Sequence, residues 1–171
     1  MSTHPEMNHV ATGVAPASEA TASDQREHMA WLLRQFAADV PGVTHAVLLS
    51  RDGLRLEDSD VDKDWADELS ASLSGVASLA SNTRGPSNQL RPASQVIIER
   101  DDCLLFVQSA GPNTAFDKHP GRGGVVNAIL AVVATTDADV GTIGFEMGRL
   151  VGKFDTHMQT PVRVGTGDEV R

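Results

Sequence analysis

The stretch Pro41 to Leu56, PGVTHAVLLSRDGLRL, decides the fold because it joins a helix end, a buried strand and a tight hairpin. Pro41 and Gly42 end a preceding helix. Val43 to Leu49 is rich in Val and Leu, and the Asp-Gly pair that follows accepts the positive φ of a tight hairpin. Leu54 to Glu57 alternates apolar and charged side chains, which predicts a partner strand with one buried face. A helix that leads into such a hairpin is typical of a small α+β domain.

Length and charge narrow the class of protein. The 171 residues, 40% of them apolar, suffice for one sizeable core. A formal net charge of −9 without a Lys/Arg cluster disfavours binding to nucleic acid or anionic lipid. The longest apolar run, Ala128 to Ala134, is too short to span a bilayer, and no basic and then apolar leader opens the sequence. These features predict a cytoplasmic protein, with the single Cys103 as a small core residue.

The first 40 residues predict a tail followed by a helix. Residues 1–23 hold hardly any large apolar side chain, so we expect them to be disordered. Asp24 and Glu27 resemble a capping box, and apolar residues then recur at helical spacing, which predicts an amphipathic helix over 25–40. Trp31 falls almost opposite that apolar stripe. It is either a contact surface for a partner or the tail, or simply an exposed residue.

A second helix is predicted over 62–83, after an acidic loop. Asp58, Asp60, Asp62 and Asp64 do not form a Ca²⁺ loop, because the glycine and the glutamate of that signature are missing. The apolar stripe of this helix is expected to face the core. It consists of Trp65, Leu69, Leu73, Val76 and Ala80.

A neighbouring face of the second helix carries a row of small side chains. Its members are Ala66, Ser70, Ser74, Ala77, Ser78 and Ser81. Small residues let another backbone approach closely, whereas an ordinary exposed face would carry Glu, Lys and Arg. The pattern predicts a helix-packing surface, with a merely Ser-rich exposed face as the alternative.

The rest of the domain is predicted as three strands and a helix. Ser94 to Arg100 and Cys103 to Gln108 read as antiparallel strands around a tight turn. A long loop, Ser109 to Asn127, leads to the apolar strand Ala128 to Thr135. Val140 to Met158 keeps helical spacing.

The order is therefore α-β-β-α-β-β-β-α. We expect a folded domain over 24–160 and a flexible C-terminal tail over 161–171, which begins at Pro161.

No catalytic constellation is visible in the sequence. There is no nucleophile elbow, no His-Glu-x-x-His and no Cys-x-x-Cys, and the six histidines lack ligand spacing. We therefore expect no catalytic residue, no metal site and no cofactor.

Three segments together resemble the Roadblock family, which includes dynein light chains of that name and bacterial gliding-motility GTPase regulators. They are WLLRQFAADVPGVTHAVLLSRDGLRL (Trp31 to Leu56), ADELSASLSGVASLAS (Ala66 to Ser81) and DADVGTIGFEMGRLVGK (Asp137 to Lys153). The resemblance covers about 25–158 and is strongest to short actinobacterial members encoded beside a sensor-kinase-like protein and a small Ras-like GTPase. One departure is the excursion from Pro112 to Gly124, which is longer than the tight turn expected between those strands.

The resemblance implies a profilin-like α/β/α sandwich: a five-stranded antiparallel sheet with one helix on one face and two on the other. It also implies a homodimer formed through the middle helix and an adjoining edge strand. The small residues Ala66, Ser70, Ser74, Ala77, Ser78 and Ser81 match the dimer and GTPase interface. Gln95, Val96 and Ile97 match the edge pairing. Asp64, Asp67 and Glu68 could steer a basic partner electrostatically.

The resulting hypothesis is a non-catalytic regulator or adaptor that homodimerises and binds a Ras-like small GTPase. It would modulate the nucleotide state of the GTPase or its recruitment to a membrane sensor complex with a kinase-like protein. The alternative is a PAS- or GAF-like small-ligand sensor, since those domains also build five-stranded antiparallel sheets. Few aromatic residues and no evident cofactor ligand count against the alternative.

Overall fold

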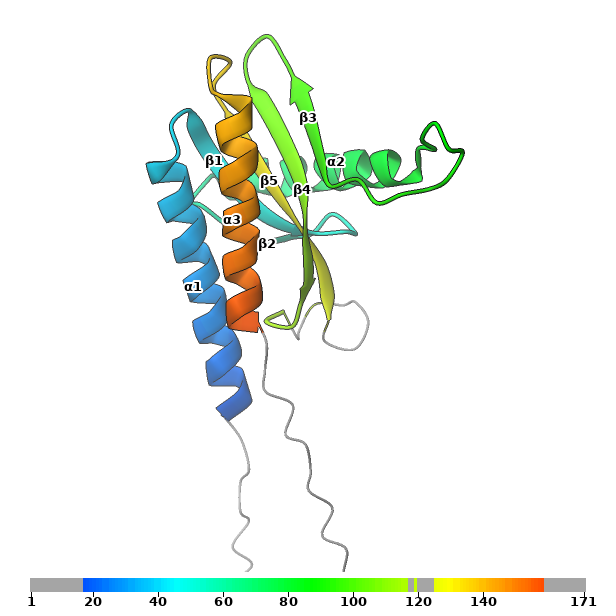
Figure 1. Ribbon diagram of the computed structural model, residues 1–171. Coiled ribbons are helices and arrows are strands. Elements are labelled where there is room, and N and C mark those ends of the chain that lie inside the picture. Colours follow the sequence, from blue (N-terminus) through cyan, green and yellow to red (C-terminus); the bar gives the residue numbers. More distant parts are fainter. Residues whose placement is uncertain (1–16, 117–118, 120–124, 159–171) are drawn as a thin grey trace, which may run out of the picture.

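Five antiparallel strands make up the centre of the fold, in the spatial order β2-β1-β5-β4-β3 (Figure 1). The computed structural model describes residues 17–116, 119 and 125–158. The strands are β1 Val43–Ser50, β2 Arg55–Asp58, β3 Gln95–Glu99, β4 Leu104–Asn113 and β5 Val126–Ala134. The last strand, β5, pairs with β1 on one side and with β4 on the other. Because it is central and covered on both faces, its sequence is almost entirely apolar.

Three helices cover this sheet. They are α1 Ala17–Asp39, α2 Lys63–Asn82 and α3 Val140–Met158. Alternate residues along the strands separate two cores: Leu48, Phe106 and Leu130 pack with residues of α1 and α3, and their neighbours Leu49, Val107 and Ile129 pack with α2. Two helices therefore cover one face and a single helix covers the other (Figure 1). The predicted α+β fold, its strand number and its element order are confirmed.

The predicted hairpin lies between β1 and β2. The Ser50 amide donates to the Leu54 carbonyl at 2.8 Å, and Gly53 takes a φ of +89° that favours glycine. The turn packs tightly against α2, because a Cβ at Gly53 would lie 2.9 Å from Ser74 Oγ and 3.2 Å from Ala71 Cα.

The start of α1 differs from the prediction. The helix begins at Ala17, so residues 17–23, which we assigned to a disordered tail, are helical, and Asp24 and Glu27 lie inside the helix. Ala is the best helix former, and the Ala-rich composition of this stretch extends the helix without an apolar face. The other parts of the predicted tails, 1–16 and 161–171, lie outside the described residues.

The predicted loop over 109–127 is shorter in the structure, because β4 continues to Asn113 and β5 already begins at Val126. The pairing shifts register between Ser109 and Gly111 and then resumes. Beyond β4 the chain re-enters the core, since Phe116 is buried together with residues of α1 and α3. The strand signal is weak in this part of the sequence because Gly111 and Pro112 normally end strands.

Candidate functional site on the α2 face of the sheet

The fully buried part of α2 ends at Leu73. Its buried residues are Ala66, Ser70 and Leu73, and Leu73 packs in the core under the helix. No residue of α2 after Leu73 is buried, and Leu79 is 72% exposed. Figure 1 shows α2 running past the edge strand β3. Val76 and Ala77 still pack against the core of the sheet, and it is the end of the helix, with Leu79, that overhangs it.

The predicted small-residue face is turned largely toward the chain itself. Ala66 and Ser70 are fully buried, and the Ser70 hydroxyl donates to the Ala66 carbonyl at 2.7 Å. Their assignment to a dimer or GTPase interface is therefore wrong, because the residues they approach closely belong to their own domain. Small side chains indicate that a backbone comes close, but they do not show whether that backbone belongs to the same chain or to another one. Ser74, Ala77 and Ser81 are half-buried and Ser78 is exposed, so their interface role stays a prediction.

A different side of α2 offers apolar surface, and we call it the α2 flank. Its members recur at helical spacing and are Trp65, Leu69, Ser72, Val76 and Leu79. Trp65 is 36% exposed and packs its ring against His45, with the ring centroids 4.8 Å apart. Leu69 and Val76 are only partly buried. The sequence assigned Trp65, Leu69 and Val76 to the core, and the structure leaves all three partly open because, within the described residues, no second helix lies beside α2.

The edge strand β3 adjoins this flank. It pairs with β4 along one side, and within the described part of the chain no strand pairs with its other side. Val96 and Ile98 face α2 and are only partly covered, whereas Ile97 faces the opposite side and is exposed. Gln95 is held by α3, since its side-chain nitrogen lies 3.8 Å from the Met147 sulfur. The strand edge that was predicted to pair with a second copy therefore has no partner strand within the described residues, and its pairing stays a prediction.

Ion pairs tie the start of α2 to β2. Arg55 donates from Nε to Asp67 Oδ1 at 2.8 Å and from a terminal nitrogen to Asp58 Oδ2 at 2.6 Å. Lys63 Nζ lies 2.7 Å from Asp67 Oδ2. Hydrogen bonds from Lys63 and Arg55 lower the pKa of Asp67 below its ordinary value. The charge of Asp67 is therefore used inside the domain, which leaves the exposed Asp64 and Glu68 for steering a partner.

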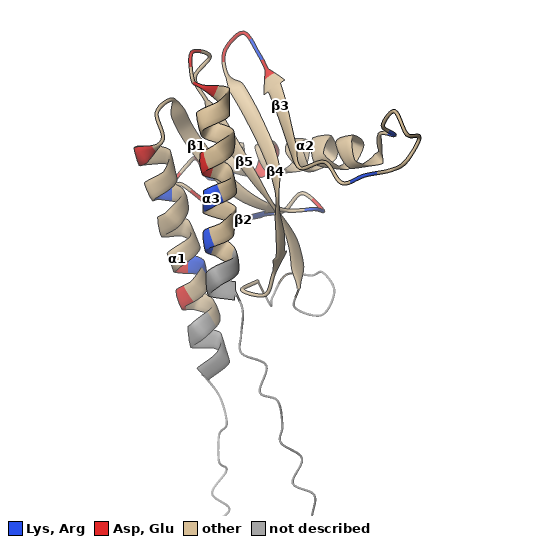
Figure 2. Ribbon diagram, viewed as in Figure 1, with Lys and Arg blue, Asp and Glu red and all other residues tan. Residues whose placement is uncertain are grey.

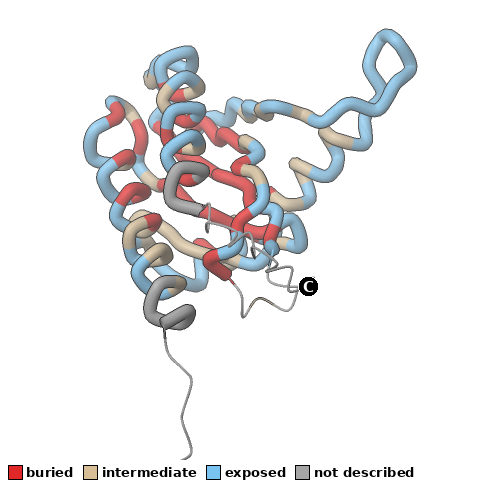
Figure 3. Tube along the Cα trace, turned by 60° about the horizontal axis from the view of Figure 1, so that its bottom comes forward, coloured by how far each residue is buried: buried red, intermediate tan, exposed pale blue. Residues whose placement is uncertain are grey.

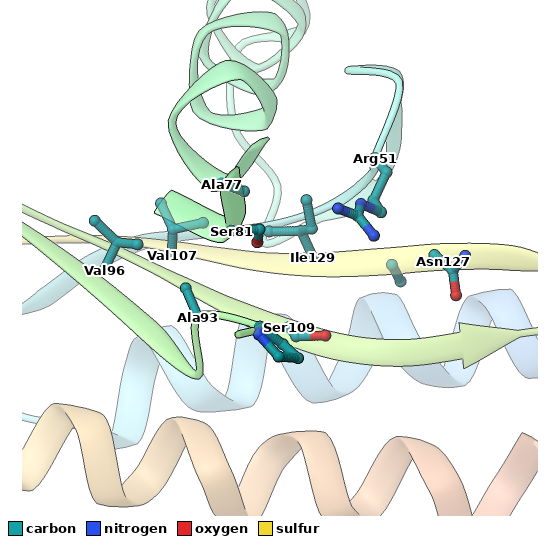
Figure 4. A pocket seen from close by; sticks show the side chains of 11 residues that line it. Arg51, Ala77, Ser81, Ala93, Val96, Val107, Ser109, Asn127 and Ile129 are labelled. Carbon is teal, nitrogen blue, oxygen red and sulfur yellow. The ribbon is translucent and has the colours of Figure 1, made fainter. Parts of the chain in front are cut away.

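A small cavity lies beside the last turns of α2 (Figure 4). Its volume is about 110 Å³, and α2 contributes Ala77 and Ser81 to its lining. Arg51 reaches over it from the hairpin, and Ser109 of β4 lies on the opposite side (Figure 4). Pockets for drug-sized ligands usually span about 300–1,000 Å³, so this cavity does not favour the small-ligand sensor.

The described residues contain little that is typical of a chemical site. Among them no group of three or more His, Cys, Asp or Glu could hold a metal ion. Burial raises the pKa of the Cys103 thiol, which makes it a poor nucleophile at neutral pH. Of the helices in the described ranges, none is both long enough and apolar enough to cross a membrane. What this face presents is a partly covered apolar flank of α2 beside the edge strand β3.

Comparisons with known proteins agree with the resemblance seen in the sequence. The family model of the Roadblock/LC7 domain matches residues 29–116. A solved Roadblock/LC7 domain from Streptomyces avermitilis is 34% identical, with a TM-score of 0.62, and the alignment covers 76% of this chain and 97% of that one. A second domain from the same organism is 31% identical, with a TM-score of 0.54 and coverages of 73% and 96%.

More distant structures share the fold. The gliding protein MglB from Thermus thermophilus is 15% identical, with a TM-score of 0.57 and coverages of 85% and 93%. No curated protein matches the chain. The family model spans about half of the chain and a solved member is more than 30% identical over most of it, so this chain belongs to the Roadblock/LC7 domain family.

Proposed function

We propose that this chain is a non-catalytic regulator or adaptor that forms a homodimer and binds a Ras-like small GTPase. The complex would modulate the nucleotide state of the GTPase or its recruitment to a sensor complex with a membrane kinase-like protein. The observation that carries the proposal is the overhang of α2, which extends beyond its own sheet with Leu79 exposed. The family resemblance supplies the class of partner.

A two-fold axis beside β3 would cover both the unpaired edge of β3 and the exposed α2 flank. Antiparallel pairing of two β3 strands joins the two sheets and hydrogen-bonds the exposed edge. The same axis places both α2 helices on one face of the joined sheet, antiparallel to each other. Each α2 flank then lies over the half-covered Val96 and Ile98 of its partner. The homodimer would give the α2 face the second helix that the opposite face already has.

The outward side of the paired helices would be the platform for the GTPase. Ala71, Gly75 and Ser78 are exposed there and small, so the surface is flat enough for another protein to approach. Asp64 and Glu68 lie on the same side of the helix start and would attract a basic partner.

Two single variants, Leu79→Arg and Ser78→Arg, test the homodimer. Leu79 lies on the α2 flank and Ser78 beside it on the outward side, and both are exposed, so neither arginine should unfold the domain. We expect light scattering to show twice the chain mass of 18.1 kDa for the wild type and for Ser78→Arg, and a monomer for Leu79→Arg. A monomeric wild type at micromolar concentration would refute the homodimer.

Calorimetry tests the choice of partner. The titrant is the Ras-like GTPase encoded nearest to this gene, loaded with GDP or with a non-hydrolysable GTP analogue. We expect the affinity to depend on the nucleotide and to fall for Ser78→Arg, whose dimer is intact. If neither loaded form binds, the proposed partner is wrong.

A further inference from the structure

The connection between α2 and β3, residues 83–94, forms a small arm that stands away from the domain (Figures 1 and 3). Arg84 and Leu90 form an isolated antiparallel bridge across it. The Asn88 amide donates to the Gly85 carbonyl at 2.9 Å, and Arg84 donates to the Asn88 carbonyl at 2.8 Å. Residues 83–92 are all exposed. The arm is therefore shaped by its own hydrogen bonds and not by contacts with the core.

Charge is distributed unevenly along α2 and this arm. Residues 57–68, which lead into α2 and form its first turns, contain seven acidic residues and one lysine. Residues 69–98 contain two arginines, Arg84 and Arg91, and no acidic residue. Figure 2 shows blue without red along the arm. In a protein of net charge −9, this segment is a local exception.

The arginines of the arm bond to groups of the arm itself. Arg84 donates to a backbone carbonyl and Arg91 to the side-chain oxygen of Gln89 at 3.1 Å. No ion pair within the described residues includes either arginine. Both guanidinium groups are exposed and keep donors for an external carboxylate.

We propose that the arm of each copy clasps the acidic start of α2 in a second copy of this chain. This inference rests on the proposed homodimer, in which the two α2 helices run antiparallel. That arrangement brings the end of each α2, and the arm that follows it, to the start of its partner. Arg84 and Arg91 then meet Asp64 and Glu68 of the second copy, and two-fold symmetry repeats the contact.

An apolar contact accompanies the charged one. Leu90 is 52% exposed on the arm, and Trp65 is 36% exposed on the first turn of α2. Apolar side chains of this size covering each other would remove surface from water at the centre of each clasp, with the arginines at its rim. The occupant best matched to a basic arm with one exposed leucine is thus the acidic, tryptophan-bearing helix start of the same sequence.

Charge reversal in two variants gives a direct test. The first variant is Arg84→Glu with Arg91→Glu, and the second is Asp64→Lys with Glu68→Lys. Each variant alone places like charges in both clasps, so we expect its dimer dissociation constant to rise at least about tenfold over the wild type. Mixing the two restores opposite charges in both clasps, and native mass spectrometry should then show mainly the heterodimer. Added salt should weaken the wild-type dimer and the heterodimer alike.

Each other result has a definite meaning. If the wild type is monomeric, the proposed homodimer fails and the clasp with it. If both variants dimerise as tightly as the wild type, or if the mixture recovers no heterodimer, the clasp is refuted while the homodimer stands. If Arg84→Glu with Arg91→Glu leaves the dimer intact and abolishes only GTPase binding, the arm serves the GTPase, and the clasp is again refuted. Circular dichroism checks that the exposed substitutions leave the fold unchanged.

Discussion

Glu57 shows how a single carboxyl group couples the stability of this domain to pH. It lies on β2, opposite Leu48 of β1, on the sheet face that α1 covers. Burial raises the pKa of Glu57 above its ordinary value, and the charges of Arg26 and Arg34 on α1 act in the opposite direction without cancelling the effect. Because the folded state holds this proton more tightly than the unfolded state, the stability from protonated Glu57 is lost as pH rises through the folded pKa.

Glu57→Gln should therefore stabilise the protein at neutral pH. The amide keeps the shape of the side chain and removes the cost of burying its charge. We expect a higher melting temperature than wild type at pH 7 and a smaller difference at pH 4, because acid favours the protonated form of the wild-type carboxyl. Glu27→Gln, at an exposed position of α1, serves as the control for replacing a carboxyl group with an amide. An equal gain at both pH values would contradict the assignment to burial.

At the residue scale, the small side chains of α2 could be read from the sequence, but the direction in which each of them points could not. The sequence could not show which surface Ala66 and Ser70 approach, because close packing within one chain and close packing against another chain require the same residue types. The exposed Leu79 was missed for a related reason, since its exposure depends on where the sheet ends.

At the scale of elements, the β1–β2 hairpin and α2 form one packed unit. Gly53 of the hairpin meets Ser74 and Ala71 of the helix. Gly75, one residue further along α2, is exposed and has no atom within 4 Å of a Cβ placed there. The two glycines differ in both space and backbone conformation, so the same substitution should have opposite effects.

Gly53→Ala should lower the free energy of unfolding by about 1–3 kcal/mol, because alanine resists a φ of +89° and its Cβ would crowd Ser74. Gly75→Ala should raise it by about 0.5–1 kcal/mol, because alanine is the better helix former. Urea denaturation of both variants measures these two changes in the free energy of unfolding. A loss of stability in both would mean that the outward side of α2 is packed against something that the structure of one chain does not contain.

Helices and strands with strong periodicity were predicted at nearly the observed positions, as for α2 and β1. The boundaries failed where composition was ambiguous. Residues 17–23 lack an apolar face and still continue α1, and Gly111 and Pro112 suggested a loop where β4 continues. Burial of Phe116 depends on a path back into the core that no local pattern encodes.

At the scale of the whole molecule, the open edge of β3 predicts protection that depends on concentration. If β3 pairs with its counterpart, those amides of residues 95–99 that point away from β4 exchange slowly in the dimer and faster after dilution to monomer. We expect hydrogen–deuterium exchange to change with concentration in β3 and in the arm, and to stay constant in β5, which is already paired on both sides. Unchanged exchange in β3 across a dilution that dissociates the dimer would place the interface elsewhere.

The central position of β5 has a consequence for how the chain acquires its structure during synthesis. The β1–β2 hairpin leaves the ribosome early and the β3–β4 hairpin later, but the strand that joins them begins only at Val126. At roughly 5–20 residues per second, the first hairpin waits for several seconds and the second for about one to a few seconds, with the edges that β5 will occupy unpaired. Nascent chains of this protein are thus most vulnerable to misassociation late in translation, and completing the sheet is one of the last steps of folding.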